Sequence, residues 1–597
     1  MDRKTIVSKT ALFVVIVVAV ILFKQVFGDE NTLVGVTIIT ASLMFMERDL
    51  TTDFLGYFIL FAVINLGQGL LAFFTGVNPV IGVLLTFIAM FTTGYLFTYN
   101  MKKPMYVAFG LQYLFMVYSP VTYEQLPMRL LALLFGAAFM MALQLVANKN
   151  RLEKAAKEIV PRIVSSLGNK INLVIQDNYN GELEEEITTS IVALSNCVQE
   201  NRQDYFHITV EGKVNFNISI AMERINILVN RIYEDYKVKN TLSSTGYTDV
   251  LNSIGDIVSN TTADRDRVDK INDQIDRING FIEKYELIFR SNNIECGVSR
   301  ENIRELLENM DFLKTSLEDV LKFEGKEYKK FVKRIEIPKG FTFKEMLKRD
   351  FNGKSIKFSY ALRSALFISI AVGLAGYFNL PEGKWLAFTL LAIIQPYKQD
   401  ADNKSKSRVY GTIIGVVVFV VLFALVKDTT IRSLLIMLSG YISSFQTRYS
   451  RQTIFITFSA LASASLIGGS GVELVVNRVF YVFAGTAVAM LANKFILPYG
   501  IDDSTKYLMD TYDKIINQIK KEINSANQGD GNIEIVRALV MKVNVIEGRV
   551  RGNLSVEDSG TYQEHEKIKD ILRRNRIEIN DLYDEYLGAY TKPKYTN

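Results

Sequence analysis

The sequence predicts an all-α polytopic membrane protein with about twelve transmembrane helices, and three observations predict it. Residues 1–148 and 358–498 are apolar enough to hold several segments of roughly 20 residues, the length that crosses a bilayer core. Each apolar block is followed by a charged block of helical pattern, residues 149–357 and 499–597. Basic short loops alternate with loops that carry little positive charge. We therefore expect two membrane blocks, each followed by a cytoplasmic helical domain.

The first apolar block divides into six candidate helices. Short polar stretches separate them, and the second and fifth are short for a full span. Short segments fit either half-helices that line a path or tilted neighbours of longer spans. The six segments lie at about 6–27, 32–46, 54–74, 78–99, 105–119 and 127–147.

Positive charge predicts how the first block is oriented. Residues 3–9 contain three basic side chains, Lys102 and Lys103 lie between the fourth and fifth helices, and a basic stretch begins at Lys149. Because cytoplasmic loops carry the excess of Lys and Arg, both ends of the block are expected in the cytoplasm. No small-residue cleavage site follows the first apolar run, which indicates a retained membrane helix rather than a signal peptide.

The first charged block contains two regular apolar stripes. Residues 268–289 and 303–320 place apolar side chains alternately three and four positions apart, as a coiled coil does. Residues 291–299 between them include Asn and Gly, which suits a turn between antiparallel helices. We therefore predict a coiled-coil hairpin over 263–323. Its stripes either pack within a helical bundle or form a surface for dimerisation or for a cytosolic partner.

The second apolar block also divides into six candidate helices. A Lys-rich loop that ends at Arg408, and a basic turn at Arg448 and Arg451, predict that this block too begins and ends inside. Lys427 and Arg432 are an exception on the outer side. The segments lie at about 359–378, 385–397, 409–426, 431–446, 452–468 and 473–497, and the C-terminal block adds helices at about 503–525, 531–548 and 560–588.

The two membrane blocks share a spaced pattern that predicts an internal repeat. Both Glu124–Gly136 and Glu473–Gly485 read Glu-x4-Arg-x6-Gly, at a constant offset of 349 residues (473 − 124 = 485 − 136 = 349). Each half has an even number of helices and begins inside. The halves are therefore expected to be parallel six-helix repeats, related by an axis along the membrane normal.

Two matched arginines are the first candidates for a transport path. Arg129 and Arg478 lie a few residues inside the outer ends of their helices, where a charge costs about 2.5–3.5 kcal/mol on insertion scales. Related by the pseudo-two-fold axis, they could attract an anion. The alternative is that each side chain snorkels to the outer interface, while Glu124 and Glu473 act as acids at helix N-termini.

The stretch 361–415 carries the most specific pattern in the chain. It contains, in order, Arg363, Trp385, Gln395-Pro396 and Arg408-x-x-Gly411-Thr412-x-x-Gly415. This order of residues resembles the fusaric acid resistance/aromatic acid exporter superfamily of membrane transporters. The resemblance is specific within this stretch, and the rest of the chain matches the superfamily more in layout than in motif. The first half departs from the pattern, with Asp53 at the position of the second Arg, so the second half is expected to hold the working site.

These signature residues divide into two expected groups. Arg363, Gln395 and Arg408 are expected on the cytoplasmic side, in a basic vestibule that gathers anions or as ordinary positive-inside charge. The others are expected at helix packing and interface positions: Gly411 and Gly415 form a G-x-x-x-G motif, Trp385 is an interfacial anchor, and Pro396 ends a helix.

The resemblance implies a transporter in the cell membrane that exports small organic anions such as aromatic carboxylic acids. The sequence has no ATP-binding motif, so the proton gradient is the expected driving force. One alternative is a passive anion channel, because the resemblance extends to plant malate channels. Another is a membrane-anchored interaction protein that uses the hairpin. The expected partners are the lipid bilayer, the anion, and either a second copy of the chain or a cytosolic protein.

Other classes of function find little support in the composition. Two cysteines, Cys197 and Cys296, and two histidines, His207 and His565, do not make a zinc site or a disulfide framework. No nucleophile–base set or cofactor motif suggests an enzyme. A net charge of +5 over 597 residues does not indicate nucleic-acid binding.

Overall fold

The structure is a computed structural model, and it confirms the all-helical class. The described residues form 22 α-helices and one two-stranded antiparallel sheet, in which β1 (Arg202–Gln203) pairs with β2 (His207–Ile208). Lys102, Lys103, Lys149, Cys296 and most of the predicted hairpin turn lie outside the described residues. The structure describes residues 3–46, 49–98, 105–148, 150–179, 181–203, 207–239, 245–262, 264, 266–290, 298–322, 342–466, 471–528, 533–554 and 562–590.

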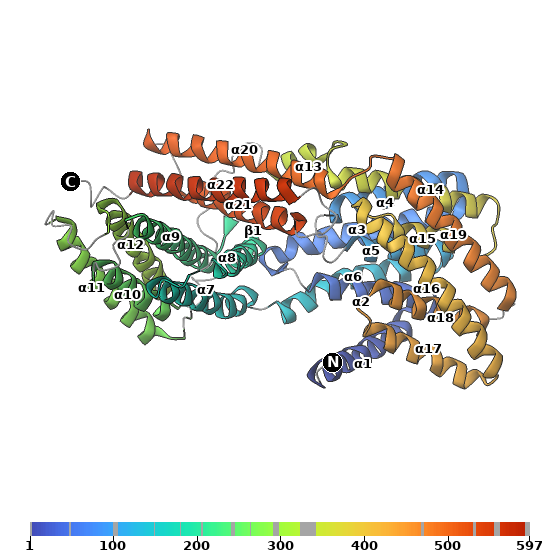
Figure 1. The fold of residues 1–597 in the computed structure, drawn as a ribbon. Helices are drawn as coiled ribbons and strands as arrows, with labels where there is room; N and C mark the ends of the chain where they lie inside the picture. Colours follow the sequence, from blue (N-terminus) through green and yellow to red (C-terminus); the bar gives the residue numbers. More distant parts are fainter. Residues whose placement is uncertain are drawn as a thin grey trace. The chain divides into compact units, whose positions relative to one another are not determined.

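The chain folds into two compact units, whose elements are labelled in Figure 1. Unit 1 consists of Met1–Asn148 and Leu347–Ser504, and it contains the apolar helices. Unit 2 consists of Lys149–Met346 and Thr505–Asn597, and it contains the charged, amphipathic helices.

The first half of unit 1 contains six helices close to the expected segments. Asp53 caps α3 by accepting a hydrogen bond from the Gly56 amide. Asn78 caps α4 in the same way, and Pro79 occupies the first helical position, where its missing N–H is not needed. The helices are α1 (Arg3–Phe27), α2 (Thr32–Phe45), α3 (Phe54–Val77), α4 (Pro79–Phe97), α5 (Met105–Tyr118) and α6 (Leu126–Ala147).

The second half also contains six helices, and one of them corrects the sequence prediction. The Lys-rich segment before residue 409, expected as a loop, is the start of α16, which begins at Lys398. Ala401, Ser405 and Arg408 are buried at spacings of four and three, so this polar stretch has a packed helical face. The helices are α14 (Ile356–Tyr377), α15 (Lys384–Ile393), α16 (Lys398–Leu425), α17 (Thr429–Ser444), α18 (Tyr449–Leu466) and α19 (Gly471–Phe495).

Seven helices within the described residues are long and apolar enough to cross a membrane. They are α1, α3, α4, α6, α14, α16 and α19; α5 and α15 are apolar but shorter. The chain is therefore a multi-pass membrane protein by length and composition, and the number of twelve spans stays a prediction.

Several helix pairs recur between the two halves of unit 1. α2 and α3 pack on α6, as α15 and α16 pack on α19, and α3 packs on α5 as α16 packs on α18. Three helix pairs cross between the halves: α4 packs on α14, α5 packs on α15, and α1 packs on α17. At the α4–α14 crossing, a Cβ on Gly94 would lie 3.0 Å from the Cα of Ala361, so these backbones are in close contact.

Unit 2 is a helical bundle in which both predicted stripes are used internally. α11 packs on α12, and α12 packs on α9. Ile278 and Met310, one from each stripe, are completely buried in a core shared with α7, α9 and α10. The coiled coil itself stays a prediction. The helices are α7 (Arg151–Ile175), α8 (Leu183–Glu200), α9 (Val210–Lys239), α10 (Thr245–Asn260), α11 (Val268–Arg290), α12 (Arg300–Lys322), α21 (Ile533–Leu554) and α22 (Tyr562–Tyr590). The residues of α13 (Phe343–Asp350) and α20 (Ile501–Asn527) are divided between the two units.

Candidate functional site

Arg129, on α6 in the first half of unit 1, is buried and fully used in hydrogen bonds. Its Nε donates to Asn31 Oδ1 at 2.9 Å, Nη1 to the Ser119 carbonyl at 2.7 Å, and Nη2 to the Glu30 carbonyl at 2.7 Å. Only 2% of the residue is exposed. The side chain therefore ties α6 to the end of α5 and to the turn before α2, and this is a structural role.

Other polar side chains of the first half also bond to one another. Gln68 Nε2 donates to Thr93 Oγ1 at 2.8 Å, and Gln112 Nε2 donates to Asn65 Oδ1 at 3.1 Å. Among the described residues of this half, the buried side-chain atoms without a hydrogen-bond partner are Gln112 Oε1 and the Tyr118 hydroxyl. Both are neutral, so every buried cationic nitrogen described in this half has a partner.

Arg478, the matched arginine on α19, has a different environment. None of it is exposed, and Nε, Nη1 and Nη2 all lack a hydrogen-bond partner within the described residues. Its Cζ lies 3.6 Å from the ring centroid of Trp385, whose indole N–H donates to Glu382 Oε2 at 2.7 Å. A cation–π contact is worth about 2 kcal/mol when desolvated, less than the several kcal/mol that burial of a charge costs. Three hydrogen-bond donors of this guanidinium therefore remain without an acceptor in the described residues.

Two further cations lie on α16 near this arginine. Arg408 is 6% exposed, and its Nη1 donates to the Tyr449 hydroxyl at 3.4 Å. Its positive charge repels that of Arg478. Lys404, one turn earlier, donates to Gln395 Oε1 at 2.9 Å and lies 5.6 Å from the Tyr449 ring centroid. The spacing of four places both cations on one side of α16. We call Lys404, Arg408 and Arg478 the cation cluster.

Neutral polar groups without partners lie on the same helices. The hydroxyls of Thr389, Thr412 and Thr457 are buried, as is Asn493 Oδ1, and none of them has a hydrogen-bond partner among the described residues. They come from α15, α16, α18 and α19. Hydroxyls can donate to an anion as well as accept. Within the described residues, the second half thus has more unsatisfied buried polar atoms than the first half, and unlike the first half it includes cationic nitrogens among them.

Arg363 does not join the cation cluster through hydrogen bonds. Its Nη1 donates to the Leu497 carbonyl at 2.6 Å, and Nη2 donates to the carbonyls of Gln395 at 3.0 Å and Pro396 at 2.9 Å. The side chain therefore holds α14 to the residues after α15 and after α19. Like Arg129, it binds backbone oxygens that helix ends leave free.

The remaining predicted residues lie at the surface or in helix packing. Glu124 and Glu473 are both exposed. A Cβ on Gly411 would lie 2.6 Å from the Ser450 carbonyl oxygen, and one on Gly415 would lie 2.7 Å from that of Ile454. These glycines therefore allow α16 to pack directly on the backbone of α18.

The structure thus brings together only part of the predicted set. Arg478 lies within electrostatic range of the like charge of Arg408 and contacts Trp385. Gln395 joins this group by accepting a hydrogen bond from Lys404. Arg129 and Arg363 instead donate their hydrogen bonds to other groups. Sequence reasoning did not single out Tyr449, which bonds to Arg408 and lies beside Lys404. It begins α18 at the end of a polar linker, and nothing in that pattern marks it.

The match to a protein family covers α16 and nearly all of α19, the two helices that carry the cation cluster. Residues 370–492 match the family described as fusaric acid resistance protein-like. Inner membrane protein YccS of Escherichia coli K12 is 26% identical over 154 residues, 26% of this chain and 21% of that protein. An uncharacterized protein, ORF2, of Neisseria gonorrhoeae is 30% identical over 159 residues, 26% of this chain and 37% of that protein.

An uncharacterized protein of Haemophilus influenzae is 26% identical over 170 residues, 28% of this chain and 23% of that protein. The matched parts span 21% to 37% of these three relatives. No solved structure matches the chain. The predicted resemblance is confirmed, and the matched segment contains Trp385 and the whole cation cluster.

Proposed function

We propose that this multi-pass membrane protein, with its fusaric acid resistance-like second half, is a secondary transporter that exports small organic anions such as aromatic carboxylates. The observation that carries the proposal is Arg478, which is completely buried and has three nitrogens without hydrogen-bond partners in the described residues. Guanidinium groups bind carboxylates through two parallel hydrogen bonds. Trp385 lies against this guanidinium, and the proposed anion would accept hydrogen bonds from its three nitrogens.

The order of the cations along α16 and α19 supports a route for the anion. Lys404 and Arg408 lie in the first half of α16, whose start is the predicted cytoplasmic end. Cations on that side raise the local concentration of anions. An anion would pass from Lys404 to Arg408 and then to Arg478, so loading takes place in the cytoplasm and the direction is export.

The burial of Arg478 favours a carrier over a passive channel. An open aqueous pore that used this residue would leave its side chain exposed, yet none of it is exposed. The recurring helix pairs, α2–α6 with α15–α19 and α3–α5 with α16–α18, support two parallel repeats. Transporters built from repeats alternate access by rocking one repeat against the other. The proton gradient is the proposed driving force.

The experiment is uptake of a labelled aromatic carboxylate, benzoate, into liposomes that contain the purified chain. The wild type should move the anion under a pH gradient, and Arg478→Gln should lower the rate about 100-fold or more, since removing one partner of a buried charge pair costs about 2–5 kcal/mol. Lys427→Gln is the matched control, because Lys427 is an exposed cation. No movement of benzoate or other organic anions under pH gradient or voltage would sink the proposal. Voltage-driven currents without proton movement would show a channel instead.

A further inference from the structure

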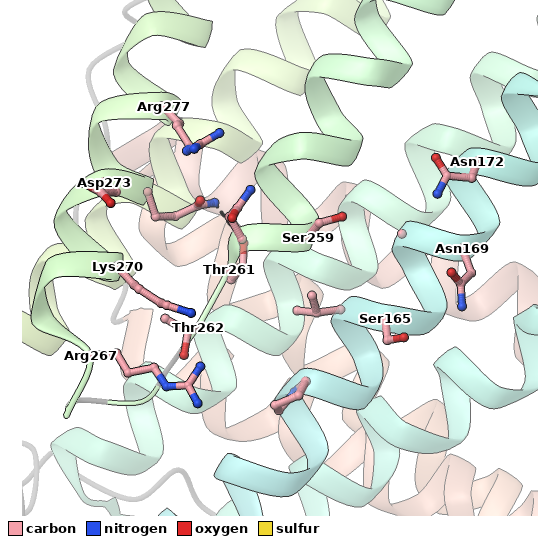
Figure 2. A pocket seen from close by; sticks show the side chains of 15 residues that line it. Ser165, Asn169, Asn172, Ser259, Thr261, Thr262, Arg267, Lys270, Asp273 and Arg277 are labelled. Carbon is pink, nitrogen blue, oxygen red and sulfur yellow. Dashed lines mark hydrogen bonds between the residues drawn. The ribbon is translucent and has the colours of Figure 1, made fainter.

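Unit 2 contains a polar cavity of about 530 Å³ that the transport proposal does not use. It lies between α7 and α11, and its floor is the end of α10 with the link that follows (Figure 2). Its volume falls within the roughly 300–1,000 Å³ that is usual for small-molecule sites. It is lined by Pro161, Val164, Ser165, Gly168, Asn169, Asn172, Ser259, Asn260, Thr261, Thr262, Arg267, Lys270, Asp273, Gln274 and Arg277.

The two walls of the cavity differ in chemistry. The wall from α7 presents neutral hydrogen-bonding groups, Ser165, Asn169 and Asn172, on one side of Figure 2. The opposite wall, from α11 and the residue before it, carries charged groups: Arg267, Lys270, Asp273 and Arg277. A ligand that fits both walls has an anionic end and a neutral end rich in hydrogen-bonding groups.

The cations on the α11 wall differ in how closely they are paired with carboxylates. Arg277 Nη1 is 2.6 Å from Asp256 Oδ2, and Arg267 uses Nε to approach Asp264 Oδ2 at 3.4 Å. Lys270 has no ion pair or hydrogen bond within the described residues. The Nη1 and Nη2 atoms of Arg267 are not used in that ion pair. Because α11 begins at the next residue, the backbone amides at the N-terminus of α11 add positive potential beside Arg267. The strongest attraction for an anion is therefore at Arg267 and Lys270.

The floor of the cavity is held in place by a buried side chain. Gln274 is completely buried, and its Nε2 donates to the Ile257 carbonyl at 2.6 Å and to Thr261 Oγ1 at 3.1 Å. These bonds fix the link after α10 against α11. The Thr262 hydroxyl in that link accepts a hydrogen bond from the Asp264 amide at 3.1 Å. The cavity is thus preformed, which lowers the entropic cost of binding.

We infer that this cavity binds a small phosphate ester on a hydroxyl- or amide-rich body, which is the chemistry of sugar phosphates and nucleotides. The phosphate lies between Arg267 and Lys270 at the start of α11, where cations and backbone amides favour a doubly charged anion. The neutral body extends toward Ser165, Asn169 and Asn172. Such a site lets unit 2 sense a cytoplasmic metabolite, and it stands independently of the anion that unit 1 carries.

The experiment is equilibrium binding to the purified full-length chain in detergent. The probes are AMP, glucose 6-phosphate and inorganic phosphate, with adenosine and glucose as neutral parents. At least one phosphate ester should bind more tightly than both inorganic phosphate and its own neutral parent. Binding of AMP alone, or of glucose 6-phosphate alone, identifies which body the α7 wall accepts. Equal binding of esters and neutral parents, or no binding of either ester, overturns the inference.

Variants then locate the site. Replacing both Arg267 and Lys270 by Gln should weaken the bound ester about tenfold or more, since charge-assisted hydrogen bonds are the strong ones. Ser165→Trp should block binding by filling the cavity from its exposed neutral wall, and Asp273→Asn should tighten it by removing a like charge. Lys284→Gln, an exposed cation farther along α11, is the control. Unchanged affinity in the double variant, or loss of binding in Arg478→Gln instead, places the ligand elsewhere and overturns the inference.

Discussion

Arg129 and Arg478 occupy matching positions of a sequence pattern in the two membrane halves, and their side chains differ in hydrogen bonding. Both are almost completely buried, at 2% and 0% exposed. Arg129 donates from all three nitrogens to oxygens of its own half, whereas Arg478 has no such partner among the described residues and lies against Trp385. The same residue type at matching positions of the shared Glu-x4-Arg-x6-Gly pattern is therefore hydrogen-bonded in one half and, within the described residues, without a hydrogen-bond partner in the other.

This difference shows that a shared sequence pattern does not ensure a shared environment for its side chains. A buried cation with hydrogen-bond partners stabilises the fold, and one without them costs free energy that a bound anion can recover. In the described part of the first half, the buried side-chain atoms without a hydrogen-bond partner are neutral. In the second half, Arg408 Nε and all three nitrogens of Arg478 lack a partner within the described residues, as do several buried hydroxyls on α15, α16 and α18. The two halves thus differ in whether their buried cations are satisfied.

Replacing each of the two arginines by glutamine, one at a time, is the strongest test of the difference between the halves. Arg478→Gln should abolish transport and leave the free energy of unfolding equal or higher, because a buried unpaired charge is removed. Arg129→Gln should lower the stability by about 3–5 kcal/mol, because it leaves buried oxygens without donors. Benzoate uptake and thermal unfolding in detergent measure the two effects. Equal loss of stability in both variants would contradict the comparison.

The glycines at matching positions give a second, smaller contrast. Gly411 faces the Ser450 carbonyl on α18, and a Cβ would lie 2.6 Å from that oxygen. The first-half counterpart is Gly56, at the offset of 355 residues that also matches Asp53 to Arg408 (411 − 56 = 408 − 53 = 355). A Cβ on Gly56 would meet the side chain of Asp53 instead, and a side chain can move. Gly411→Ala should therefore destabilise the protein by about 1–3 kcal/mol through overpacking, and Gly56→Ala should cost less. Unfolding temperatures compare them, and a larger loss in Gly56→Ala would reverse the contrast.

Much of the fold follows from sequence because apolar length and charge alternation are local signals. All twelve expected membrane segments correspond to helices, and most helix ends lie within a few residues of the expected positions. The exception is α16, whose hydrophilic first residues predict a loop, although Ala401, Ser405 and Arg408 pack at helical spacing. Polarity identifies exposure to water more reliably than it identifies the end of a helix.

The site was less predictable, because hydrogen-bond partners come from other helices. The repeat pattern singled out Arg129 and Arg478 equally, yet the oxygens that occupy Arg129 belong to Glu30, Asn31 and Ser119, far away in the chain. The family-like pattern included Arg363, which binds backbone carbonyls. Only packing distinguishes a buried cation with partners from one without.

Unit 2 supplies a satisfied buried charge whose behaviour depends on pH. Lys170 is completely buried and donates to Glu184 Oε2 at 2.7 Å and to Asn226 Oδ1. Burial alone would raise the pKa of Glu184, but the charge of Lys170 and hydrogen bonds from Lys170 and Asn226 hold that pKa below its ordinary value. Burial also lowers the pKa of Lys170, which the nearby carboxylate opposes.

The sign of the pH effect follows from the lowered pKa of Glu184. The ion pair stabilises unit 2 fully above the unfolded pKa, and this stabilisation is lost as pH falls through the folded pKa. The unfolding temperature should therefore decrease below about pH 4.5, the ordinary range of a Glu carboxyl. Glu184→Gln should flatten that decrease and lower stability at neutral pH. If the unfolding temperature of Glu184→Gln decreased at acid pH as much as that of the wild type, other carboxyl groups would control the decrease.

The smallest contrast separates hydroxyls with and without partners. Thr93 in the first half accepts from Gln68 and donates to the Ala89 carbonyl, while the Thr412 hydroxyl in the second half is buried without a partner among the described residues. Thr93→Val should cost about 1 kcal/mol, the net worth of a typical hydrogen bond, and leave uptake per folded molecule unchanged. Thr412→Val should leave stability unchanged or slightly higher, because it removes an unsatisfied buried group. Its uptake rate should decrease several-fold if the hydroxyl donates to the passing anion. An unchanged rate would remove Thr412 from the route and confine the proposed anion contacts to the cation cluster.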